Sequence, residues 1–286
     1  MELEMEYESD KSGEHRNVAR LFLVLDALSK ASAGGLRLTD VVEATGLGKT
    51  TAHRILGGLV IHGLAEHDED TGRFFIGLRM LSWATAARDR FGLARLAEPA
   101  LVRIARQTQD TVYLVVRVGD EIVCLDCREG SFPIKVLTLN IGDRRPLGIG
   151  VGSLAIMASL PDAEIDRLFV TNAEALSHYP FDEVRLRQMI AATRQNGYAY
   201  NNVHVFHGME NLTEMAGIGV PIRKNDGTPV AALHLTGIVS RLDAPRRDNL
   251  VATLSHEAHR IEKELEPLLD TVVNADRHQV KRGSTY

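Results

Sequence analysis

Long hydrophobic runs are absent from this 286-residue sequence. Its most apolar pieces, LFLVLDAL and LAIMASL, are far shorter than the roughly 20 residues that a membrane-spanning helix needs. The first ten residues, MELEMEYESD, also lack the basic start and the apolar core of a signal peptide. We therefore expect a soluble, cytoplasmic protein with no membrane partner.

Cysteine is scarce, with two residues in the chain. Cys124 and Cys127 form a C-x-x-C pair, but the surrounding EIVCLDCR alternates like a β-strand, in which residues three apart point to opposite faces. No second pair exists to complete a zinc site. We interpret both cysteines as ordinary strand residues and predict neither a metal nor a cofactor.

Complete enzyme motifs are also absent. His256 and His259 lie three residues apart, whereas the zinc-protease motif needs histidines four apart, so we expect a solvated helix face there. Ser153 lacks the second glycine of a nucleophile elbow. Four further histidines have no diagnostic metal-binding spacing: His178, His204, His207 and His234. His234 is better interpreted as a hydrogen-bonding group of a pocket. We predict no catalytic residue.

Acidic residues are missing from one stretch of a chain whose net charge is −5. Residues 44–65 contain no Asp or Glu, while Lys49, His53, Arg54 and His62 lie there. Because the distribution of charge matters more for a polyanion partner than the sum, this stretch is compatible with contact to nucleic-acid phosphates.

The same region has the pattern of a winged helix-turn-helix over residues 15–77, preceded by a disordered acidic tail over 1–14. Apolar spacing predicts a first helix over about 17–31 and a third over about 49–62. Thr39 is expected to cap the second helix, and Gly46 to end it. LAEHDEDTGRFFIG then predicts a hairpin with Asp70 and Gly72 at its tip.

A linker helix over 78–92 is predicted to lead into a second domain over 93–270, followed by a flexible tail over 271–286. TVYLVVRV and EIVCLDCR predict a hairpin with IKVLTL after it, and GIGVPIRKNDGTPVAALHLTGI predicts another before a closing helix over about 245–265. Between them, the glycine-rich PLGIGVG precedes a helix, as either a small-anion site or a plain tight turn. This order of elements is typical of an α+β fold.

These residues resemble the IclR-type family of bacterial transcription regulators. The resemblance rests on TGLGKTTAHRILGGLVIHGLAEHDEDTGRFFIGLRML, GDRRPLGIGVGSLAIMA and GIGVPIRKNDGTPVAALHLTG, in that order. It implies a winged helix-turn-helix joined by a linker helix to a GAF-like effector-binding domain with a central antiparallel sheet. It also implies a homo-oligomer, either a dimer formed through the DNA-binding half or a tetramer, and repression is the commoner outcome in the family.

For DNA contact, we expect the third helix to read bases through Thr50, Thr51 and Arg54 while Lys49 and Arg73 hold phosphates. The full predicted set is Thr39, Lys49, Thr50, Thr51, His53, Arg54 and Arg73. Two symmetric copies would favour a palindromic double-stranded operator.

For the effector, the resemblance implies a pocket lined by Gly148, Ile149, Gly150, Asn201, Gly217, His234 and Thr236. Members that bind small acids have a cysteine at the position of Gly217 and serines at those of His234 and Thr236, and an insertion over 203–212 blurs the alignment near Asn201. Glycine for cysteine is expected to enlarge the pocket, and histidine for serine to add a potential cation. We therefore expect a carboxylate bulkier than glyoxylate, with an aromatic acid as a candidate.

Two other function classes stay open at this stage. One is a metabolic enzyme that carries a helix-turn-helix-shaped accessory module, since the second domain is large and has a glycine loop and several histidines. The other is a winged helix that binds proteins rather than DNA. Steep salt dependence of binding to random duplex would distinguish a DNA reader from both.

Overall fold

The computed structural model describes residues 13–31, 34–202, 215–243 and 246–282, with the backbone alone for 13–15, 87–91 and 266–282. The chain divides into two compact units, residues 1–87 and 88–286. Within the described parts, no helix is long and apolar enough to cross a membrane. The predicted tail over 1–14 lies outside the described residues, except for 13 and 14, which belong to the first helix.

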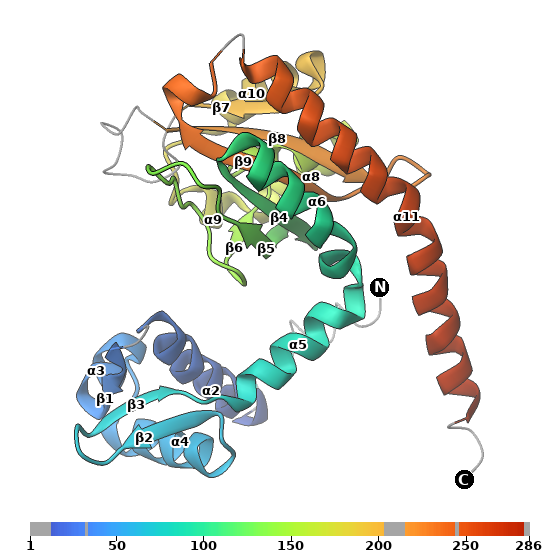
Figure 1. The fold of residues 1–286 in the computed structure, drawn as a ribbon. Helices are drawn as coiled ribbons and strands as arrows, with labels where there is room; N and C mark the ends of the chain where they lie inside the picture. Colours follow the sequence, from blue (N-terminus) through green and yellow to red (C-terminus); the bar gives the residue numbers. More distant parts are fainter. Residues whose placement is uncertain (1–12, 32–33, 203–214, 244–245, 283–286) are drawn as a thin grey trace. The chain divides into compact units, whose positions relative to one another are not determined.

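The first unit is a winged helix-turn-helix (Figure 1). Its hairpin strands pair antiparallel, and a short strand that the sequence pattern did not predict joins them in the order β1-β3-β2. The elements are α2 (Gly13–Lys30), β1 (Leu36–Arg37), α3 (Leu38–Thr45), α4 (Lys49–Ile61), β2 (Ala65–Asp68) and β3 (Arg73–Ile76).

One core holds these elements together. Leu28 of α2, Val41 of α3 and Leu56 of α4 are fully or almost fully buried in it, as the helical spacing predicts. The turn between α3 and α4 depends on Gly46, which has φ = 65° and whose N–H donates to the Val42 carbonyl over 2.9 Å. A residue with a side chain would be strained in that left-handed conformation.

The predicted cap of α3 is wrong. The helix begins at Leu38, so Thr39 lies within the first turn and its hydroxyl donates to Oδ1 of Asp40 over 3.2 Å. Oδ2 of Asp40 instead accepts the N–H of Arg37 over 2.9 Å, and this bond lowers the pKa of the Asp40 carboxyl. The unpredicted strand β1 ends at Arg37, and the chain therefore enters the helix earlier than the pattern indicates.

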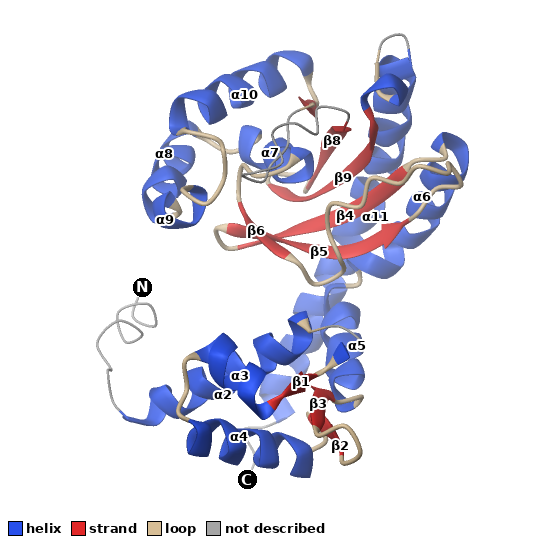
Figure 2. Ribbon diagram, turned by 90° about the vertical axis from the view of Figure 1, so that its left-hand side faces the viewer, coloured by secondary structure: helices blue, strands red, loops and turns tan. Residues whose placement is uncertain are grey.

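The second unit is a six-stranded antiparallel sheet with helices on both faces (Figure 2). The strand order is β6-β5-β4-β9-β8-β7. Its strands are β4 (Thr111–Val118), β5 (Glu121–Arg128), β6 (Arg144–Pro146), β7 (Ala199–Asn201), β8 (Met215–Arg223) and β9 (Pro229–Ile238). Both predicted hairpins, β4-β5 and β8-β9, are present.

Helices form two separate cores with this sheet. α6 (Leu93–Thr108) and α11 (Arg246–Arg282) pack on one face, and α7 (Val151–Ala158), α8 (Asp162–Thr171) and α10 (Glu183–Asn196) pack on the other. The short α9 (Ala173–Leu176) and the 3-10 turn η2 (Val239–Arg241) complete the unit. Gly92, with φ = 57°, separates α5 (Arg79–Phe91) from α6, close to the predicted end of the linker helix.

Three other expectations for this unit differ from the structure. IKVLTL, residues 134–139, forms no strand; it is an irregular segment whose Val136 and Leu139 are buried while its other apolar side chains are exposed. The closing helix runs beyond the predicted 265 to Arg282. Glu257 is buried rather than solvated, because the guanidinium of Arg103 on α6 donates to both its carboxylate oxygens over 2.8 and 2.7 Å.

The two cysteines lie on the same face of the sheet, not on opposite faces. A β-bulge shifts the register so that Cys124 pairs with Val115 and Cys127 with Tyr113, and all four pack toward the α7 core. An extra residue in one strand reverses the alternation of the residues after it, which explains the wrong prediction. Burial raises the pKa of the Cys124 thiol to about 12, so it is an inert core group.

Candidate effector pocket and DNA-binding surface

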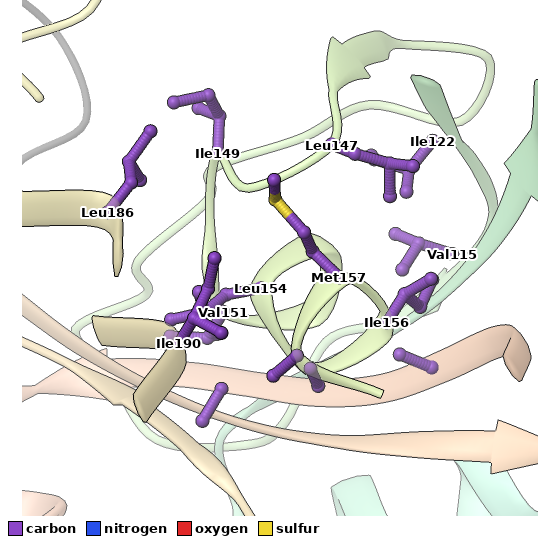
Figure 3. Packing of buried hydrophobic residues seen from close by; sticks show 14 of the residues in the cluster. Val115, Ile122, Leu147, Ile149, Val151, Leu154, Ile156, Met157, Leu186 and Ile190 are labelled. Carbon is purple, nitrogen blue, oxygen red and sulfur yellow. The ribbon is translucent and has the colours of Figure 1, made fainter. Parts of the chain in front are cut away.

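The N-terminus of α7 is the centre of the second unit's candidate site. All eight residues of α7 are buried, and Figure 3 shows its side chains among others from β4, β5 and α10. Gly150 precedes the helix with φ = 86°, and a Cβ on Gly152 would lie 2.4 Å from Nδ1 of His234. Glycine at these positions therefore permits the turn and the close packing of α7 on β9.

A cavity of ≈ 60 Å³ opens at this helix end. Because one water molecule needs about 10–15 Å³ on this measure, the cavity has room for a small organic molecule rather than for a nucleotide cofactor. Six of the seven residues that the resemblance assigned to the pocket line it: Ile149, Gly150, Asn201, Gly217, His234 and Thr236.

Gly148 does not belong to this lining. Its N–H donates to Oγ of Ser153 over 2.9 Å, and a Cβ there would lie 3.0 Å from Sδ of Met157 in the core. Its φ of 100° shows that it serves the turn before α7. The structure thus brings the rest of the predicted set together and leaves Gly148 behind it.

Gly217 does not enlarge the pocket in the expected way. A Cβ at this position would lie 2.8 Å from Cγ2 of Val151, so the side chain of α7 already fills the space that glycine leaves. The expectation that glycine simply vacates volume is wrong because the helix has moved into close contact with β8 at this point.

Arg145 lines the cavity and was missed by the sequence analysis. It lies on β6, is 6% exposed and donates through Nη2 to the Thr138 carbonyl. Burial lowers the pKa of its guanidinium, but an arginine side chain stays charged in proteins. The only sequence signal was its position directly before the glycine-rich loop.

His234 is not the cation that its replacement of serine suggested. Its ring stacks on that of Tyr113, with centroids 4.8 Å apart and planes 11° apart. Burial, and then the charge of Arg145, lower the pKa of His234 to about 3, so the imidazole is neutral at physiological pH. The pocket therefore combines one cation, Arg145, with one neutral ring.

The helix end adds further positive potential. The first N–H groups of an α-helix have no partner within the helix, and they carry a partial positive charge that favours an anion. Val151, Gly152 and Ser153 supply these groups to the cavity wall. Together with Arg145, they form an environment suited to a carboxylate or another small anion.

In the first unit, the predicted DNA-contacting residues cluster on α4 and at its start. The side chains of Lys49, Thr50, His53 and Arg54 are exposed, and that of Thr51 is half-buried. Helical spacing places Thr50, Arg54 and Gly57 on one outward stripe. Thr39 is exposed on α3.

Arg73 is held by its own unit. Its Nη1 donates to the carbonyls of Gly34 and Gly35, each over 3.1 Å, so the guanidinium is tied to the loop before β1. The tip of the hairpin beside it is acidic: Oδ1 of Asp68 accepts the N–H groups of Asp70 and Thr71, and Glu69 and Asp70 are exposed.

The predicted histidine candidates do not form a metal site where they can be followed. His178 is exposed, with Nδ1 3.0 Å from the Glu174 carbonyl, while His256 and His259 lie exposed on α11. His204 and His207 lie outside the described residues. Across the described chain, no group of three or more potential ligands could hold a metal ion.

Comparison with known proteins agrees with this architecture. The family model "Bacterial transcriptional regulator IclR C-terminal" matches residues 85–263, and "IclR helix-turn-helix domain" matches residues 17–69. The HTH-type transcriptional regulator KipR of Bacillus subtilis is 28% identical over 80% of this chain and 90% of its own length. The transcriptional repressor IclR of Escherichia coli is 21% identical over 82% and 84%.

Solved structures share the fold. IclR of Thermotoga maritima superposes with a TM-score of 0.68 at 22% identity, covering 88% of this chain and 99% of that one. An IclR homologue from Microbacterium hydrocarbonoxydans, complexed with 4-hydroxybenzoate, has a TM-score of 0.69 at 23% identity, with the same coverage. With a helix-turn-helix in one unit and an effector-binding domain in the other, this chain is a transcription regulator rather than an enzyme, and it belongs to the IclR family.

Proposed function

We propose that this protein is a repressor that binds a palindromic operator and responds to a small organic acid in the cavity at the N-terminus of α7. The observation that carries the acid is the buried guanidinium of Arg145 on the cavity wall beside the helix N-terminus. A buried cation and a helix N-terminus both favour an anionic ligand. The 4-hydroxybenzoate complex of the Microbacterium homologue and the repressor name of the E. coli relative agree with this proposal.

For DNA, the support is the exposed face of α4. It presents Lys49, Thr50 and Arg54, with no acidic residue on the helix. Arginine and threonine at the start of such a helix reach base edges, whereas lysine neutralises phosphate. Arg73 is proposed as a phosphate contact through the nitrogens that the Gly34 and Gly35 carbonyls leave unoccupied.

A homodimer is the assembly that a palindromic operator needs. Apolar side chains that are about half exposed on α2 and α5 support an interface within the DNA-binding half: Val18, Phe22, Leu81 and Trp83. Pairing of such dimers into tetramers is compatible with the same scheme.

The test starts with selection of bound sequences from random duplex DNA. We expect a palindromic site, bound with a steep decrease of affinity as salt rises. Arg54→Ala should cost roughly 1–3 kcal/mol and relax the preference at one base pair per half-site. Arg95→Ala, an exposed arginine of the other unit, is the control. Binding without salt dependence or sequence preference would instead support a protein-interaction module.

A further inference from the structure

One polar atom in the pocket has no partner. Nδ1 of His234 is the buried side-chain nitrogen or oxygen atom without a hydrogen-bond partner among the described residues, and His234 is 4% exposed. A buried polar group without a partner destabilises the free protein. A ligand that supplies the missing partner therefore gains affinity from this position.

The neighbouring polar groups are already paired. Thr236 donates its hydroxyl to the Val136 carbonyl over 2.7 Å. The Tyr113 hydroxyl accepts the N–H of Thr138 over 3.1 Å, and Oγ of Ser153 accepts the N–H of Gly148 over 2.9 Å. A polar effector group that reaches this part of the cavity thus finds His234 as the partner in need of a bond.

The charges in the pocket decide what that group is. Arg145 offers one permanent positive charge, while burial and the same arginine keep His234 neutral. A second carboxylate against His234 would lie buried without a counter-charge, which is costly. A hydroxyl both donates and accepts a hydrogen bond, so it pairs with Nδ1 in either tautomer of the imidazole.

We propose that the effector is a monocarboxylic acid that bears a hydroxyl group, with its carboxylate at Arg145 and the first N–H groups of α7 and its hydroxyl at Nδ1 of His234. This inference rests on the proposed function, which assigns an acid to the cavity. It adds a second recognition point, which selects one class among the acids small enough to enter.

The experiment compares each hydroxy acid with its parent acid by calorimetry and thermal shift on the full chain. The probes are hydroxybenzoates against benzoate and hydroxybutyrates against butyrate. At least one hydroxy acid should bind about tenfold more tightly than its parent, because a site built for a hydroxyl rejects the analogue that lacks it. Equal affinities within every pair, or no binding by any probe, would overturn the inference.

Two substitutions locate the two recognition points. His234→Phe keeps a flat ring over Tyr113 but removes Nδ1, and the ratio between hydroxy and parent acid should fall to about one. Arg145→Met keeps the length of the side chain but removes the charge, and both acids of each pair should bind at least about tenfold more weakly. A ratio that survives His234→Phe would contradict the role of Nδ1.

Matched controls are available on the surface. His178→Phe changes an exposed histidine, and Arg144→Met changes the exposed arginine next to Arg145, which binds Glu121. Neither should alter the ratio. DNA binding by the same preparations separates the two proposals: loss of salt-dependent binding to duplex contradicts the regulator, whereas intact binding without hydroxyl selectivity contradicts only this inference.

Discussion

Two glycines within helices show how differently the same residue is used. A Cβ on Gly152 of α7 would lie 2.4 Å from Nδ1 of His234 and 2.9 Å from Cγ2 of Val115. A Cβ on Gly57 of α4 would meet nothing within 4 Å. The first glycine permits packing, and the second leaves the outward face of the helix bare.

Alanine at each position should therefore have opposite effects. We expect Gly152→Ala to lower the free energy of unfolding by about 1–3 kcal/mol through overpacking. Gly57→Ala should raise it by about 0.5–1 kcal/mol, because alanine favours a helix interior. Urea unfolding of both variants beside the wild type measures this, and equal stability of the two variants would contradict the packing at His234.

His234 also predicts a pH dependence. Its pKa is about 3 in the folded chain, against about 6.5 in the unfolded chain, so the unfolded state binds the proton first as pH falls. Below pH 6.5 the folded state therefore loses stability relative to His234→Phe, by up to about 1.4 kcal/mol per pH unit. Unfolding of both proteins at pH 7, 6 and 5 tests this; a constant difference between them would exclude the buried neutral ring.

Single residues are also where sequence analysis was least complete. It identified His234 and Thr236 as pocket residues, but from resemblance rather than from a pattern in the residues. Arg145 was missed because an arginine two residues before a glycine loop reads as a surface charge, and only the pairing of β6 with β5 turns it inward.

At the scale of elements, the second unit is joined by an ionic cluster. Asp110 follows α6, is 4% exposed, and accepts from Arg241 of η2 over 2.7 Å and from Arg246 at the start of α11 over 2.8 Å. Both arginines also donate to the Thr108 carbonyl. Four segments thus meet at one carboxylate.

Asp110→Asn should consequently destabilise the fold by about 2–3 kcal/mol. This lies below the roughly 3–5 kcal/mol of a fully buried pair because Arg246 keeps contact with water. Asp162→Asn, which removes the partner of Arg194, is the control: Asp162 is 80% exposed, and such a pair contributes less than about 1 kcal/mol. Thermal unfolding of the two variants should differ clearly.

The hairpin of the first unit leads to another expectation. Glu69 and Asp70 are exposed at its tip, whereas Asp68 holds the turn. Two carboxylates near phosphates oppose binding, so Glu69→Gln combined with Asp70→Asn should raise affinity for random duplex several-fold. Fluorescence anisotropy at low salt measures this, and unchanged affinity would mean that the tip stays away from DNA.

Helices and hairpins were largely predictable, because apolar periodicity and turn residues are local properties. The bounds of α4 and of both hairpins of the second unit agree with the pattern to within a residue or two. β1 and residues 134–139 were not predictable: one becomes a strand only by pairing with β3, and the other stays irregular because its alternate residues pack over the pocket.

The whole molecule carries a net charge of −5 and yet is proposed to bind a polyanion. The separation of charge between the acid-free α4 and the rest of the chain makes this compatible. Lys49→Gln should reduce the slope of log K against log salt by about 1, as expected for the loss of one phosphate contact. Lys263→Gln on α11 should leave the slope unchanged; equal effects of both variants would indicate attraction by net charge alone.

The bulge in β5 has a consequence for how this protein tolerates sequence change. Because the extra residue sets which layer receives Cys127 and Arg128, removing one residue from the strand would exchange inward and outward side chains over its last part. Replacing Leu125, which is only partly buried, leaves that order intact. Across related chains, this strand should therefore vary in composition but keep its length, and alignment gaps should fall outside residues 121–128.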